Sequence, residues 1–135
     1  MGQYYVIVNI EKKEFLHPHQ FGDGLKLLEF GCNSCDILTG LTILLADENN
    51  NRYWWNLKSK DSIIGSWAGN KIVIAGNYAD PDKFGIKTAT KEDPNCNLYD
   101  KATKYYKDVS LAVIDVLKEN FYIKNNLRKK ISLKK

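Results

Sequence analysis

Runs of apolar and polar positions divide the chain into short elements of both secondary-structure types. Residues 3–10 (QYYVIVNI) are rich in aromatic and β-branched side chains, which is typical of a strand whose two faces are both covered. Residues 11–13 are polar and indicate a turn, so residues 14–17 are expected to return as the second strand of a hairpin. Pro18 ends that strand because proline has no amide hydrogen for a ladder.

Helical spacing recurs in two later segments. Apolar residues within 37–45 repeat at intervals of three and four, and those within 111–117 do the same, so each segment predicts a helix with one buried stripe. Gly40 lies in the middle of the first helix, where it costs about 1 kcal/mol relative to alanine, and this favours close approach of a neighbouring element. A shorter helical turn is predicted over residues 25–30, with Asp23 or Gly24 as its cap.

The best candidate for a central strand is residues 71–75 (KIVIA), which are apolar on both faces. Residues 77–97 are polar and contain prolines, and so long a loop is typical of a functional or disordered segment. Residues 103–107 are expected to form a last strand. The resulting order predicts an α+β fold in which two or three helices pack on one face of a mostly antiparallel sheet.

The length of 135 residues suits one globular domain, which we place at residues 1–123. Residues 124–135 form a basic tail with six lysine or arginine side chains and no acidic one; removing them from the 20 basic residues leaves 14 against 16 acidic ones. Such a tail is typical of a flexible, solubilising end. The alternative is weak nucleic-acid contact, since lysines that neutralise phosphates release counterions.

Nothing in the chain indicates export or a membrane. No apolar run approaches the roughly 20 residues that a bilayer-spanning helix needs, and the first residues lack the basic and apolar regions of a signal peptide. Three cysteines cannot all pair within one chain. We therefore expect a cytoplasmic protein with reduced thiols.

Two glycine-containing stretches concentrate the polar and aromatic residues that could form a site. They are residues 17–31 (HPHQFGDGLKLLEFG) and residues 65–82 (GSWAGNKIVIAGNYADPD). Turn glycines let backbones approach closely, so we expect the two stretches to meet, with His19 or Asp23 near Asn77 or Asp80. The side chains expected to contact a ligand are His17, His19, Asp23, Lys26, Trp67, Asn77 and Asp80.

Trp67 has two interpretations. Its small neighbours on both sides could leave one face of the indole open for stacking on a base or sugar, or could make room for a core indole. We favour the exposed platform, because glycine is costly in conformational entropy if its only role is to fill a core.

Catalysis is the alternative to binding. His19 or Glu29 is the candidate general base. The chain has no nucleophile elbow of the GxSxG type, and its glycines follow neither GxGxxG nor the P-loop pattern. Whether a reaction occurs is left open by the sequence.

The CxxC motif of residues 32–35 raises zinc and redox chemistry. With His17 and His19, the two cysteines provide four potential zinc ligands, but the two histidines are closer in sequence than is usual for a histidine pair. A cysteine at a helix start can also have its thiolate stabilised, as in redox dithiols. We expect neither a metal nor another cofactor.

Three segments resemble those of short uncharacterised proteins from bacteria and phages. These are the opening MGQYY, the DGLKLLE segment and the AGNYAD loop, in a similarity that reaches to about Tyr99. Asn77 departs from the aspartate expected there, which weakens any metal or proton chemistry at that position. The resemblance implies no activity; it implies a bacterial or phage setting and one site built from both stretches.

The combined prediction is a small cytoplasmic binding or inhibitory protein of phage or accessory type. Its expected partner is a nucleotide-like ligand or a host protein. The alternative is a hydrolase or transferase acting on a nucleotide or an ADP-ribose-type substrate.

Overall fold

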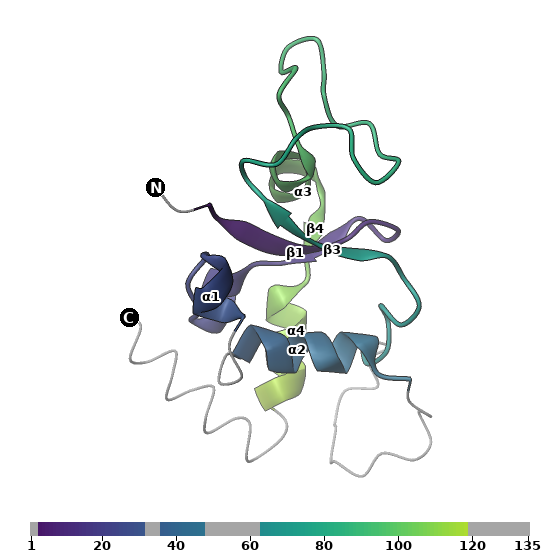
Figure 1. Ribbon diagram of the computed structural model, residues 1–135. Coiled ribbons are helices and arrows are strands. Elements are labelled where there is room, and N and C mark those ends of the chain that lie inside the picture. Colours follow the sequence, from purple (N-terminus) through teal and green to yellow (C-terminus); the bar gives the residue numbers. More distant parts are fainter. Residues whose placement is uncertain (1–2, 32–35, 48–62, 119–135) are drawn as a thin grey trace.

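The computed structural model describes residues 3–31, 36–47 and 63–118. In this part of the chain, four strands form one mixed sheet in the order β3-β1-β2-β4 (Figure 1). β1 pairs antiparallel with both β2 and β3, while β4 runs parallel to β2. The predicted α+β fold with a mostly antiparallel sheet is confirmed. β3 lies at the edge of this sheet, which corrects the prediction that residues 71–75 form a central strand. The strands are β1 (Tyr5–Asn9), β2 (Glu14–Leu16), β3 (Ile72–Gly76) and β4 (Lys107–Asp108).

The side chain of Asn9 stabilises the turn between β1 and β2. Asn9 is fully buried, and its Oδ1 accepts a hydrogen bond of 2.9 Å from the amide of Lys12. Its Nδ2 donates to Oδ1 of Asn70 at 3.0 Å, on the segment that leads into β3. Asn9 thus fixes the turn and joins it to the edge strand.

Helices cover both faces of the sheet. α1, α2 and α4 lie on one face, as predicted, and α3 lies on the other (Figure 1). None of the helices in the described ranges is both long and apolar enough to cross a membrane. The helices are the 3₁₀ helix η1 (Pro18–Phe21), α1 (Leu27–Phe30), α2 (Asp36–Leu45), α3 (Leu98–Tyr105) and α4 (Ser110–Lys118).

α3 corrects the prediction of a strand over residues 103–107. The helix begins at Asn97, whose Oδ1 accepts from the amide of Asp100 at 3.0 Å, while the Asp100 carboxylate accepts from the amide of Asn97 at 3.5 Å. This reciprocal capping satisfies amides that a first helical turn leaves unpaired. It outweighs the strand propensity of the tyrosines that follow, so the chain becomes extended only at Tyr106, and the paired strand is limited to Lys107–Asp108.

The larger core lies between the sheet and the helices α2 and α4. Ile7 and Leu16 project into it from the sheet. A Cβ atom on Gly40 would lie 2.7 Å from Cγ1 of Val113, which explains the glycine in the middle of α2. The close approach predicted for Gly40 is therefore confirmed, and α4 is the neighbour.

The smaller core lies on the opposite face, under α3. Val6, Val8 and Ala75 pack there against Leu98 and Ala102 of the helix. Side chains alternate between the two faces along a strand, so β1 contributes to both cores. The prediction that β1 is covered on both faces is confirmed.

Hydrogen bonds hold the long loop of residues 77–97 in place. Nδ2 of Asn97 donates to the carbonyls of Asn77 and Ala79 at 3.0 and 2.9 Å. Oγ1 of Thr88 donates to the carbonyl of Cys96 at 2.6 Å and accepts from the amide of Asp82 at 2.9 Å. The loop is thus anchored to the end of β3 and to the start of α3.

Trp67 is a core residue, which corrects the prediction of an exposed platform. Its side chain is fully buried, and its Nε1 donates a 2.8 Å hydrogen bond to Glu14. Its amide donates to the carbonyl of Leu44 at 2.8 Å, so the turn that carries it closes the end of α2. Gly65 has a φ of 74° and packs against the carbonyl of Ala46. This glycine serves the turn and leaves no room for a ligand.

Replacing Trp67 with alanine should therefore destabilise the fold. We expect the free energy of unfolding to fall by about 3–5 kcal/mol because the indole leaves a cavity. Urea unfolding measures this loss, and the m-value should not change. Trp67→Phe is the matched variant: it keeps an aromatic ring but loses the bond to Glu14, so its loss should be smaller. A loss of about 0.5 kcal/mol or less for alanine, as surface substitutions cause, would contradict the core assignment.

Candidate functional site

The two glycine-containing stretches lie on either side of Tyr4 at one end of the sheet, and the expected approach of His19 or Asp23 to Asn77 or Asp80 stays a prediction. On one side Tyr4 forms an antiparallel bridge with Lys26. On the other side its carbonyl accepts from the amide of Asn77 at 2.9 Å, and its amide donates to Oδ1 of Asn77 at 2.9 Å. Neighbouring strands lie about 4.8 Å apart, so the two stretches are separated by roughly 10 Å at this point.

A cavity of about 390 Å³ opens on the side of Lys26. Three of the polar residues singled out in the sequence line it, and so does Tyr4, which is 43% exposed. The cavity lies in the range of small-molecule sites. The complete lining is Tyr4, His19, Gly24, Leu25, Lys26 and Glu29.

The wall formed by α1 is held by local contacts. The amide of Lys26 donates to Oε1 of Glu29 at 3.0 Å, and the amide of Glu29 donates to the carbonyl of Lys26 at 2.8 Å. A Cβ atom on Gly24 would overlap the Glu29 carboxylate, so the glycine allows that carboxylate to lie against the backbone. Glu29 therefore has a structural role at the start of α1, which competes with a role as general base.

His17 and His19 contact each other through a hydrogen bond and through their rings. The amide of His19 donates to Nδ1 of His17 at 3.3 Å, and the ring centroids lie 5.3 Å apart. Because Nδ1 accepts this bond, the neutral His17 ring carries its proton on Nε2. Burial lowers the pKa of His17, the charge of His19 lowers it further, and Asp108 opposes both effects. The amide of His17 donates to Oγ of Ser110 at 2.8 Å, which ties η1 to α4.

Asp23 is not available to a ligand, which corrects its predicted role. It is buried, and its Oδ2 accepts a 3.0 Å hydrogen bond from the amide of Ile37 in the first turn of α2. A carboxylate at that position favours the positive end of the helix. Asp23 was expected to cap the turn that follows it, but the carboxylate caps a helix that starts thirteen residues later.

The two predicted ligand-binding residues in the loop after β3, Asn77 and Asp80, differ in burial. Asn77 is half-buried and uses its side chain to hold the amide of Tyr4, so it shapes the site from the opposite side of the strand. Asp80 is exposed in the turn that follows β3. Trp67 lies in the core, as described above. The CxxC motif, Trp54 and Trp55, and the basic tail lie outside the described residues.

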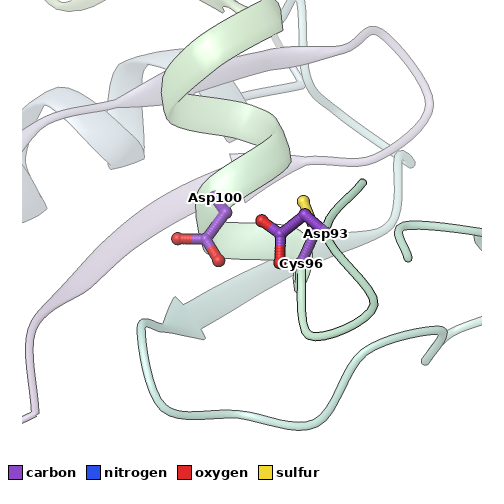
Figure 2. A group of neighbouring side chains, drawn as sticks. All are labelled: Asp93, Cys96 and Asp100. Carbon is purple, nitrogen blue, oxygen red and sulfur yellow. The ribbon is translucent and has the colours of Figure 1, made fainter. Parts of the chain in front are cut away.

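A second group of potential ligands, missed in the sequence, lies at the start of α3 (Figure 2). The ligand atoms of Asp93, Cys96 and Asp100 all lie within 4.8 Å of one another. Asp100 caps the helix, and Asp93 accepts from the amide of Asn95 at 3.3 Å. Burial raises the pKa of the Cys96 thiol, and both carboxylates raise it further. Helix capping accounts for the position of Asp100, and the Sγ of Cys96 lies 3.8 Å from the carbonyl of Asn97.

The chain matches no family model, and comparisons with curated proteins and with solved structures found no match either. Functional inference therefore rests on the residues and contacts described above.

The lowered pKa of His17 predicts acid sensitivity. The folded state favours the neutral ring, whereas the unfolded chain takes up a proton near the ordinary value of 6.5. Stability is therefore fully present above about pH 6.5 and is lost as the pH falls through the folded-state pKa. Urea unfolding midpoints at pH 7.5 and 5.0 measure the loss.

His17→Gln should reduce this pH-dependent loss, since glutamine does not titrate. His19→Gln is the matched control. It should reduce the loss less, because burial affects the pKa of His17 more than the charge of His19 does. An equal loss in the parent protein and in His17→Gln would show that other groups cause the acid sensitivity.

Proposed function

We propose that this protein is a small binding protein that captures a nucleotide-like ligand in the cavity beside Tyr4. The observation that carries the proposal is the composition of that cavity, which combines a tyrosine, a lysine and a histidine, while its one carboxylate, on Glu29, accepts a hydrogen bond from the amide of Lys26. A nucleotide offers a matching set of groups, namely a flat base and a phosphate.

The phosphate matches the exposed side chains of Lys26 and His19. Hydrogen bonds to charged groups contribute about 1.5–3 kcal/mol each, more than those between neutral groups. Lysine acts as a compact positive charge at phosphates. Two such donors on one side of the cavity favour an anionic group there.

The base matches Tyr4. Tyr4 lines the cavity and is 43% exposed, and its backbone is held by hydrogen bonds to Asn77 and by the amide of Tyr5, which donates to the carbonyl of Leu25 at 2.9 Å. A ring on a fixed backbone loses little freedom when a ligand stacks on it. Tyr4 thus takes the role that the buried Trp67 cannot have.

A second candidate is the capture of a host protein through α1. Leu27 and Leu28 of that helix are 41% and 85% exposed and lie next to the same cavity. Exposed apolar side chains that lie side by side are common at protein interfaces. A cytoplasmic setting of phage or accessory type belongs to both versions of this proposal.

Titration calorimetry with adenosine monophosphate tests the nucleotide proposal. We expect binding that weakens by roughly 10-fold or more in Lys26→Gln, since one charge-assisted hydrogen bond is lost, and a comparable loss in Tyr4→Ala. Lys12→Gln is the control, because Lys12 is exposed and lines a different cavity. Adenosine should bind more weakly than the monophosphate.

Two outcomes would redirect the proposal. If neither adenosine monophosphate nor ADP-ribose binds, the nucleotide proposal is wrong, and the exposed leucines of α1 become the next surface to test. If chromatography shows that either compound is converted, the protein is an enzyme, and His19→Gln and Glu29→Gln should be compared for loss of turnover.

A further inference from the structure

Another cavity lies on the opposite face of the sheet, beside α3. It measures about 530 Å³ and lies between the helix and the loop of residues 87–96. A second cavity of about 480 Å³ shares Lys87, Ala89 and Thr90 with it. We call the surface lined by these two neighbouring cavities the α3 groove. This inference does not depend on the proposed function.

Lysines lie on both sides of the α3 groove. Lys101 and Lys104 are three residues apart on α3, so they share one face of the helix. Lys87 and Lys91 line the groove from the loop. Against these four cations the groove has two carboxylates, on Glu92 and Asp93. Lys87 also forms a 3.5 Å ion pair with Asp82, so three further lysines stand against the two carboxylates of this acidic patch, and the groove is weakly basic overall.

The walls of the groove are built before any ligand binds. Nζ of Lys101 donates to the carbonyl of Lys87 at 3.0 Å, so one lysine joins the helix to the loop. Oδ1 of Asp82 accepts from the amides of Thr88 and Ala89 at 2.8 and 3.0 Å. A preformed groove avoids the ordering cost that a mobile loop would add to binding.

Tyr105 extends the groove with an aromatic surface. Its side chain is 76% exposed at the end of α3, where it lines the larger cavity beside Lys104. A lysine-lined groove with an exposed ring is the combination found in proteins that bind single-stranded nucleic acid, where bases stack on aromatic side chains.

We propose that the α3 groove binds a single strand of nucleic acid. The phosphates contact Lys101, Lys104 and the loop lysines, and a base stacks on Tyr105. The two carboxylates repel phosphates, so they face the bases, where a carboxylate accepts from the exocyclic amine of cytosine. Cytosine-rich strands should therefore bind more tightly than thymine-rich ones.

Other ligand classes fit the groove less well. A metal ion would be repelled by four ammonium groups. A polypeptide rich in acidic residues matches the lysines but offers few flat rings for Tyr105 and no reason for the acidic patch. A strand of nucleic acid satisfies the lysines, the ring and the carboxylates together.

Fluorescence anisotropy with labelled ten-nucleotide oligo(dC) and oligo(dT), measured on the full chain over a range of salt concentrations, tests the proposal. Lys101→Gln/Lys104→Gln should lower the slope of log K against log salt by about 1.4, or about 0.7 for each lost phosphate contact on a single strand. The matched control is Lys12→Gln/Lys107→Gln, which removes the same charge from a different cavity and should leave the slope unchanged. If the two double variants show the same slope, the lysines of the α3 groove do not contact phosphates, and the proposal is wrong. That result is expected if the basic tail alone binds the strand.

Two further comparisons separate the proposal from simple charge attraction. Tyr105→Ala should weaken binding by about 5-fold or more, the lower end for loss of one stacked base, whereas Tyr78→Ala, an equally conservative change at another exposed tyrosine, should not. Asp93→Asn and Glu92→Gln should each reduce the preference for oligo(dC) over oligo(dT). Equal affinity for polyglutamate, or the absence of any preference between the two oligonucleotides in the parent protein, would overturn the proposal.

Discussion

The fold depends on β1 being enclosed on all sides. The strand pairs with β2 on one edge and β3 on the other, and its side chains enter both cores. Each buried aliphatic side chain of such a strand contributes about 1.5–3 kcal/mol. Because the strand cannot shift its register by one residue without exchanging the two cores, the position of Tyr4 at its end is fixed as well. The cavity beside Tyr4 is thus placed by the core.

Asn97 has the corresponding role on the other face. It caps α3 and holds the carbonyls of Asn77 and Ala79 with the same side chain. One buried amide therefore connects the helix that forms a wall of the α3 groove to the turn that follows β3. A buried polar group of this kind is costly if any of its bonds is lost, so the loop and the helix are expected to keep a single arrangement.

The two proposed sites lie on different faces and differ in chemistry. The cavity beside Tyr4 is small, with one lysine, one histidine and a ring on a fixed backbone. The α3 groove combines four lysines with two carboxylates and a more exposed tyrosine. The first suits a single nucleotide and the second suits a strand, and the substitutions that test one do not touch the other.

The sequence by itself determined the elements whose evidence is local. The hairpin, the helical stripes of α2 and α4, the close approach at Gly40 and the existence of a strand at residues 72–76 follow from apolar spacing and glycine position, which act over a few residues. That this strand lies at the edge of the sheet, and not at its centre as predicted, depends on pairing with β1. Only the tertiary structure decided the roles of Trp67, Asp23 and Asn97. Each of these side chains bonds to a partner far along the chain, namely Glu14, Ile37 and Ala79. Such pairings depend on how the elements pack, and no local pattern records them.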